Sequence, residues 1–168
     1  MKKYKGFTLI EILIVLVVIG ILSSMMVIAS NESTTTAKAS TIVSNLRNFS
    51  MAAMAYYTDN VDHLTSDSDL TAEVKDYLHN EGKIIDGEKY FVVRDTEKKI
   101  WWAKYKLDDK DNDRVREKLS GRAESANLIG TIGDNMPTKT NDKYPQYQYN
   151  STTKHDCVWL LIRSSKKK

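Results

Sequence analysis

Three aspartates at alternate positions are the residues of this chain whose types and spacing suit a metal ion. Asp109, Asp111 and Asp113 match the opening of a calcium-binding loop, in which oxygen ligands from alternate residues converge on Ca²⁺. The match ends at Arg114 and Ser120, which stand where such a loop needs a turn glycine and a bidentate glutamate. We therefore expect a solvated acidic loop that caps a helix beginning near Arg114, with a structural Ca²⁺ site as the alternative.

Glu11 is a carboxylate next to an apolar run in which no other charge occurs. Residues 12–29 form eighteen consecutive positions without a charged side chain. As a helix they would span about 27 Å, close to the thickness of a bilayer core. A charge in mid-bilayer costs about 2.5 to 3.5 kcal/mol for Asp, Lys or Arg, and Glu should be similar. Glu11 therefore needs a partner or a position at the interface.

The sequence contains no motif typical of an enzyme. It lacks a phosphate-binding glycine loop, a zinc-binding histidine motif and a nucleophile elbow. His155, Asp156 and Cys157 are adjacent, and we weigh a catalytic or metal-binding group there against a surface histidine beside a core cysteine. The second interpretation needs only ordinary packing, so we expect neither an enzyme nor a cofactor other than the possible Ca²⁺.

A long helix must carry Glu11 and continue well beyond the apolar run. We expect about fifty residues of helix from Phe7 onward, because no Pro or Gly separates the apolar run from the amphipathic stretch that follows. The polar residues 31–36 could form a linker, but we predict that they stay helical. The alternative of a membrane-tethered coiled coil lacks sustained heptads. The amphipathic stretch has apolar residues at spacings of three and four: Ala39, Ile42, Leu46, Phe49, Ala53 and Tyr56.

The remainder of the chain predicts an α+β head. In the strand near 99–107, Trp101 and Tyr105 point to one face, which should lie on the long helix, and Trp102 and Lys104 point to the other. The fold class is therefore a long N-terminal helix packed on a small antiparallel sheet. The predicted elements are a helix at 69–81 ending at Gly82, strands at 89–94 and 99–107, a helix from Arg114 that ends where it meets Gly121, a short helix near 126–129, and strands near 147–149 and 157–163.

Residues 5–11, Lys-Gly-Phe-Thr-Leu-Ile-Glu, resemble the class III signal of type IV pilins and of type II secretion pseudopilins. The resemblance implies that a prepilin peptidase cuts after Gly6 and methylates the new N-terminal Phe7. It also implies that Glu11 sets the register of assembly by meeting the Phe7 ammonium of a neighbouring subunit. A secretory signal that releases a soluble domain after Ala29 and a plain transmembrane anchor are the alternatives, and neither explains Glu11.

The resemblance divides the chain into four parts. These are a leader at 1–6, a transmembrane or filament-core helix at 7–29, the amphipathic second half of that helix at 30–58, and a globular head at 59–168. The implied function is a structural subunit of a type IV pilus, with a pseudopilin of type II secretion or competence as the alternative. The implied partners are other copies of the chain, a prepilin peptidase, a platform protein and an assembly ATPase. The chain would lie in the cytoplasmic membrane before assembly and in a surface filament afterwards.

Charge and cysteine content fit this organisation. The 168 residues include 25 Lys and Arg against 22 Asp and Glu, but Lys2, Lys3 and Lys5 precede the expected cut. The mature chain then has 25 − 3 = 22 basic residues against 22 acidic ones, which gives no support to nucleic-acid binding. Cys157 is the only cysteine, so the chain cannot form the C-terminal disulfide of many Gram-negative pilins.

Overall fold

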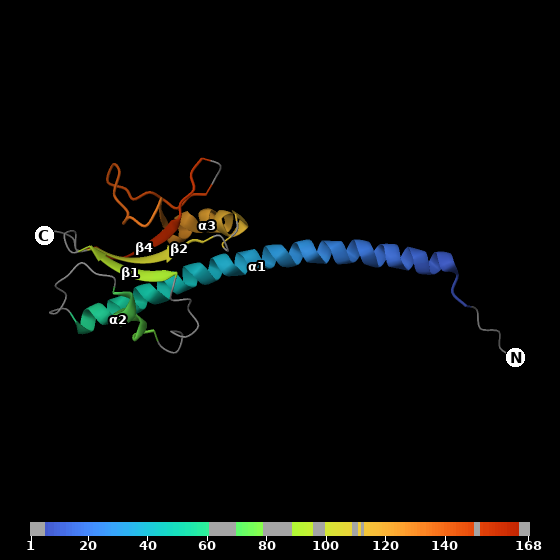
Figure 1. Cartoon of the computed structure of the whole chain (residues 1–168), viewed down its shortest axis with the longest axis horizontal. Coiled ribbons are helices and arrows are strands. Elements are labelled where there is room, and N and C mark those ends of the chain that lie inside the picture. The colour runs from blue at the N-terminus through green and yellow to red at the C-terminus, as the bar shows by residue number, and fades with distance from the viewer. Residues whose placement is uncertain are drawn as a thin grey trace. The chain divides into compact units, whose positions relative to one another are not determined.

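The computed structural model describes residues 6–60, 70–78, 89–95, 100–108, 111, 113–149 and 152–164 of the chain. The chain divides into two compact units, Met1–Ala37 and Lys38–Lys168, and its first helix contributes to both. The elements are α1 (Leu9–Asp59), α2 (Thr71–Lys75), β1 (Tyr90–Asp95), β2 (Ile100–Lys106), α3 (Asp113–Ala126), β3 (Ile129–Thr131) and β4 (Cys157–Ser164) (Figure 1).

The first half of α1 is apolar on all sides. Its large apolar side chains between Leu9 and Val27 are 48% to 84% exposed, and α1 is long and apolar enough there to cross a membrane. The polar stretch at 31–36 is helical, as predicted. The hydroxyls of Ser33 and Thr35 donate to the carbonyls of Ala29 and Asn31, at 3.1 and 2.8 Å, and so satisfy their hydrogen bonding within the helix.

The second half of α1 buries the predicted apolar stripe. Leu46 and Ala53 are completely inaccessible, and Phe49 is 1% exposed. Phe49 stacks on Tyr90 of β1 with ring centroids 5.5 Å apart. The Asn45 amide donates to the Tyr90 hydroxyl at 3.2 Å. Tertiary packing therefore holds this half of the helix against the sheet.

The four strands form an antiparallel sheet in the order β1-β2-β4-β3. The predicted hairpin is confirmed, since β1 pairs with β2 from Tyr90 opposite Tyr105 to Asp95 opposite Ile100. The antiparallel pairing and the alternation of side chains along β2 are also as predicted. Trp101 lies in the cluster that contains α1, whereas Trp102 lies in a different cluster.

The two faces of the sheet are covered by different parts of the chain. One face packs on α1, α2 and α3 and forms the larger core. The other carries a smaller cluster of Ile100, Trp102, Ile129, Cys157 and Trp159, against which Met136 and Tyr144 pack. Tyr144 meets Trp102 edge to face at a centroid separation of 4.9 Å. The segment between β3 and β4 thus covers this face of the sheet, on which none of the described helices packs.

Groups from outside the sheet form hydrogen bonds with both of its edge strands, β1 and β3. At the β1 edge, the Val92 N–H donates to the Thr71 hydroxyl and the Leu70 N–H donates to the Val92 carbonyl, each at 2.9 Å. At the β3 edge, the Gly130 N–H donates to the Pro145 carbonyl at 3.0 Å. These bonds occupy backbone groups that an edge strand otherwise leaves unpaired.

Two predictions for the segment after Arg114 were wrong. The helix α3 does not end at Gly121, because that glycine faces open space and fits the helix without a packing constraint. A strand, β3, replaces the short helix predicted near 126–129. Asn127 adopts a left-handed φ of 52°, and the Leu128 N–H bonds the Ala123 carbonyl at 2.8 Å. This is a Schellman cap, which ends the helix and turns the chain into the strand.

Two further elements are shorter than predicted. The second helix, α2, has five residues from Thr71 to Lys75, and its predicted cap at Gly82 lies outside the described residues. The predicted strand at Tyr147 and Tyr149 is reduced to isolated bridges on either side, Ile129 with Gln146 and Tyr149 with Lys154. The final strand, β4, is confirmed.

Candidate functional site

The Gly6–Phe7 peptide lies outside the helix. Gly6, Phe7 and Thr8 precede α1 and are exposed, and a Cβ at Gly6 would have no described atom within 4 Å apart from those of its chain neighbours. The Phe7 side chain is 86% exposed. A protease can therefore reach this peptide without unwinding any helical turn.

Thr8 and Glu11 form a capping box at the start of α1. The Thr8 backbone N–H and its hydroxyl both donate to Glu11 Oε2 at 2.7 Å, and the Glu11 N–H donates to Thr8 Oγ1 at 3.3 Å. This reciprocal arrangement satisfies donors that every helix start leaves free. A partner for Glu11 was expected outside its own chain, whereas the structure supplies one within it, and the Thr-x-x-Glu spacing is the known signature of this capping box.

The acidic loop between β2 and α3 binds groups of its own chain. Asp111 is 7% exposed, and its Oδ2 accepts from the Tyr105 hydroxyl at 2.8 Å and the Asp108 N–H at 3.2 Å. Lys89 Nζ lies 3.4 Å from the same oxygen and 2.9 Å from Asp108. Burial, together with the bond to Asp111, raises the pKa of Tyr105 above its ordinary value. The Asp113 carboxylate instead accepts from the Tyr149 hydroxyl.

Arg116 supplies a positive charge to this loop. Its guanidinium donates to three backbone carbonyls, those of Asp111 at 3.0 Å, Asp108 at 3.2 Å and His155 at 3.3 Å. Sequence spacing gave no signal for this role, since one of the carbonyls, that of His155, comes from a segment 39 residues away. Asp109 lies outside the described residues, and the described ones contain no group of three His, Cys, Asp or Glu able to hold a metal. The Ca²⁺ site therefore stays a prediction.

The His155 side chain packs between Gly130 of β3 and the segment that contains Gln148. Its Nδ1 accepts the Gln148 N–H at 3.0 Å, and the ring lies against Gly130, where a built Cβ would stand 2.0 Å from Nδ1. The side chain is 8% exposed. Burial lowers the pKa of His155, and the neighbouring Asp156 only partly offsets that effect. A neutral imidazole is the form that can accept the Gln148 hydrogen bond.

Cys157 makes no catalytic arrangement with His155 in the described structure. Its Sγ lies 3.3 Å from the Asp134 carboxylate, which pairs with Lys106 at 2.7 Å. The Lys106 hydrogen bond is the main reason that the pKa of Asp134 falls to about 2. Burial, with the Asp134 bond, raises the pKa of the Cys157 thiol to about 12. The thiol is therefore protonated at neutral pH and is not an activated nucleophile.

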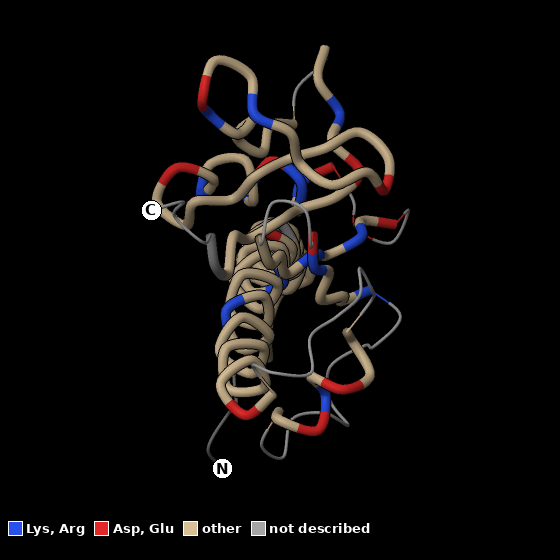
Figure 2. The backbone as a smooth tube through the Cα atoms, turned by 90° about the vertical axis from the view of Figure 1, so that its left-hand side faces the viewer, with Lys and Arg blue, Asp and Glu red and all other residues tan. Residues whose placement is uncertain are grey.

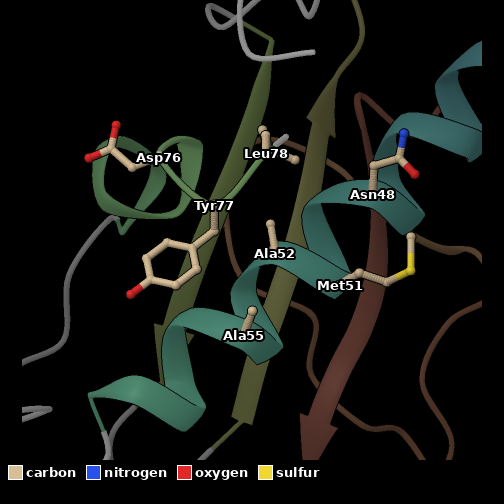
Figure 3. A pocket seen from close by; sticks show the side chains of 7 residues that line it. All are labelled: Asn48, Met51, Ala52, Ala55, Asp76, Tyr77 and Leu78. Carbon is tan, nitrogen blue, oxygen red and sulfur yellow. The ribbon is translucent and has the colours of Figure 1, made fainter. Parts of the chain in front are cut away.

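A groove of about 670 Å³ lies beside the second half of α1. Figure 3 shows α1 side chains and those of the turn after α2 facing this groove. Asp76 is the only charged residue among those that line it, so the described lining offers no paired acid and base. The lining residues are Asn48, Met51, Ala52, Ala55, Asp76, Tyr77 and Leu78.

Residues 1–27 match the prokaryotic N-terminal methylation motif, the class III signal peptide of type IV pilins and pseudopilins. The motif supports a pilin-like or pseudopilin precursor, processed by a prepilin peptidase and assembled into filaments in general. The long helix followed by a small antiparallel sheet is a pilin-like architecture. No curated protein and no solved structure matches the chain.

Proposed function

We propose that this chain is a structural, non-enzymatic subunit of a type IV pilus. The observation that carries the proposal is the methylation motif at residues 1–27, together with an exposed Gly6–Phe7 peptide directly before an apolar helix. Cutting there removes the basic leader and keeps the helix, which anchors the subunit until a platform protein and an assembly ATPase move it into a surface filament. The new N-terminal Phe7 is the methylated residue.

Assembly places the Glu11 carboxylate near the Phe7 ammonium of a neighbouring subunit. Thr8 occupies Oε2 of Glu11, and Oε1 has no hydrogen bond within the described structure, so one oxygen is open to an intermolecular donor. An unpaired charge inside an apolar bundle costs several kcal/mol, and each charge here offsets the other. The pairing sets the axial register of neighbouring helices.

The acidic loop between β2 and α3 favours a second candidate, a pseudopilin of type II secretion or competence. Some pseudopilins have a calcium-binding loop in the head, and the Asp109, Asp111 and Asp113 spacing is similar to it. Electron microscopy of a deletion strain, combined with assays of protein secretion and of DNA uptake, separates the two functions. Loss of surface filaments supports the pilus, whereas intact filaments with a loss of secretion or uptake support the pseudopilin.

Processing tests the motif directly. Gly6→Val should leave the precursor uncut, because the peptidase reads the residue before the scissile bond, whereas the smaller change Gly6→Ala should be tolerated in part. The measurement is an immunoblot of precursor and mature chain, with N-terminal sequencing of the mature form. Cutting of Gly6→Val at the normal rate would rule the motif out.

Glu11→Leu tests assembly. The substitution makes the helix more apolar, so membrane insertion should persist, and cleavage should persist because the cut precedes Phe7. Surface filaments should be lost. Blots of the membrane fraction and the sheared surface fraction decide the outcome, with Glu11→Asp expected to be intermediate. Normal filaments from Glu11→Leu would exclude an assembly role for this carboxylate.

A further inference from the structure

The second half of α1 has an exposed side with almost no charge. Opposite the buried stripe lie six exposed residues, which we call the outer face of α1: Ser44, Arg47, Met51, Met54, Ala55 and Thr58. Met51 and Met54 are 63% and 50% exposed. Arg47 is the only charged residue of α1 between Lys38 and Asp59, and α1 is accordingly almost entirely tan in Figure 2.

This composition is unusual for a helix face in water. A surface helix normally presents several charged side chains on the side away from its core, whereas the outer face of α1 has two methionines and an alanine among its six residues and only one charge. Arg47 forms no ion pair with any described residue. Met51 and Ala55 also line the groove beside α2, so the outer face continues into a concave surface (Figure 3). These features fit a surface that another apolar helix covers.

The first half of α1 presents a stripe with matching spacing. Glu11, Val15, Val18 and Leu22 follow one another at intervals of 4, 3 and 4 residues, as do Arg47, Met51, Met54 and Thr58 on the outer face. Each set carries one charge, and the two charges have opposite sign. Val15, Val18 and Leu22 are 52%, 48% and 61% exposed. Glu11 also has one oxygen, Oε1, that accepts no hydrogen bond from the described residues.

We propose that the outer face of α1 binds the Glu11 stripe of a second copy, with the helices parallel and Glu11 beside Arg47. In this register Val15 lies beside Met51 and Val18 beside Met54. Apolar surfaces are joined and the single charges are paired, so neither charge is left alone in an apolar contact. The inference rests on the proposed filament. A subunit in a filament has several neighbours, so Arg47 and the Phe7 ammonium can reach Glu11 from different copies.

Paired cysteines test the register in the full chain, expressed with its prepilin peptidase. Oxidation of sheared filaments that carry Val15→Cys and Met51→Cys should produce disulfide-linked ladders on a non-reducing gel. The pair Val15→Cys and Lys38→Cys is the matched control and should give none, because Lys38 lies 13 residues before Met51 on the same helix. The native Cys157 is buried and should not react.

Charge reversal tests the pairing. Arg47→Glu should reduce surface filament at least tenfold, Arg47→Lys should retain most of it, and Lys38→Glu should have little effect. Filaments from the Val15 and Met51 variant without ladders would overturn the register, as would normal assembly of Arg47→Glu. If the unmodified chain forms no filament, the proposed function fails and this inference fails with it.

Discussion

The two halves of α1 belong to one helix but are stabilised differently. In the first half the large apolar side chains are at least 48% exposed, whereas the buried stripe of the second half includes Leu46 and Ala53 at 0%. Hydrogen bonds within the helix hold the first half, including those of the capping box that Thr8 and Glu11 form at its start. Packing on the sheet holds the second half.

This difference predicts which changes affect folding and which affect assembly. A substitution in the second half changes the free energy of unfolding of the head, because it changes buried contacts. A substitution in the first half changes only how the helix meets lipid or another helix. The three tryptophans, Trp101, Trp102 and Trp159, are all buried in the head, so their fluorescence follows head unfolding in detergent-solubilised full-length chain.

The largest expected effect comes from replacing a leucine by alanine, and the same replacement in each half of α1 gives the comparison. Leu46→Ala should lower the free energy of unfolding by about 3 kcal/mol, since it leaves a cavity at a fully buried site. Leu16→Ala should change it by less than about 0.5 kcal/mol, because Leu16 is 63% exposed. Urea titration followed by tryptophan fluorescence measures both. Similar losses would mean that the two halves are not independent.

The next comparison is the effect of Gly→Ala substitutions on the free energy of unfolding of the head. Gly130→Ala should destabilise the head by about 2 kcal/mol, because the new Cβ would overlap the His155 ring. Gly121→Ala in α3 meets open space and should stabilise by about 0.5 to 1 kcal/mol. Gly20→Ala, in the first half of α1, should leave head unfolding unchanged. A tolerated Gly130→Ala would show that the His155 ring can move aside.

Replacing Arg116 should lower the free energy of unfolding by less than replacing Leu46. Arg116→Met removes three hydrogen bonds to carbonyls and should cost about 1 to 3 kcal/mol, whereas Arg116→Lys should restore only part because lysine lacks the planar fork. Adding a chelator should leave the Tm of the unmodified chain unchanged, since Lys89 already pairs with Asp111. A chelator-sensitive Tm that Ca²⁺ restores would instead support the predicted metal site, because a ligand of the folded state stabilises it.

The smallest expected effect is a pH dependence from His155. Its pKa is lowered in the folded head by burial, so the unfolded chain binds more protons as the pH falls through the ordinary value of 6.5. Stability should therefore be full above that value and decline below it. His155→Asn keeps an acceptor for the Gln148 N–H but does not titrate. It should flatten the unfolding free energy between about pH 7.5 and 5; an unchanged slope would assign the dependence to another group.

Patterns within one element were predictable from the sequence. The apolar stripe at Leu46 and Phe49, the hairpin, and the opposite orientations of Trp101 and Trp102 follow from helical and strand periodicity. The capping box of Thr8 and Glu11 could also have been predicted, because its Thr-x-x-Glu spacing lies within one helical turn.

Features that join distant segments were not predictable. Arg116 reaches the carbonyl of His155 across 39 residues, and no local pattern encodes that contact. The end of α3 at Asn127 depends on a left-handed residue other than glycine, which is a weaker signal in the sequence than Gly121. Tertiary context decided both.

The hydrogen bonds at the two edges of the sheet affect how closely many heads can be packed together. A polymer places many copies of the same head at high local concentration, where open strand edges would join head to head and add β-structure without limit. At one edge the backbone N–H and carbonyl of Val92 are hydrogen-bonded to Thr71 and Leu70, and at the other the N–H of Gly130 is hydrogen-bonded to Pro145. The heads can therefore be crowded together while remaining separate molecules, which leaves their contacts to side chains and to the helices.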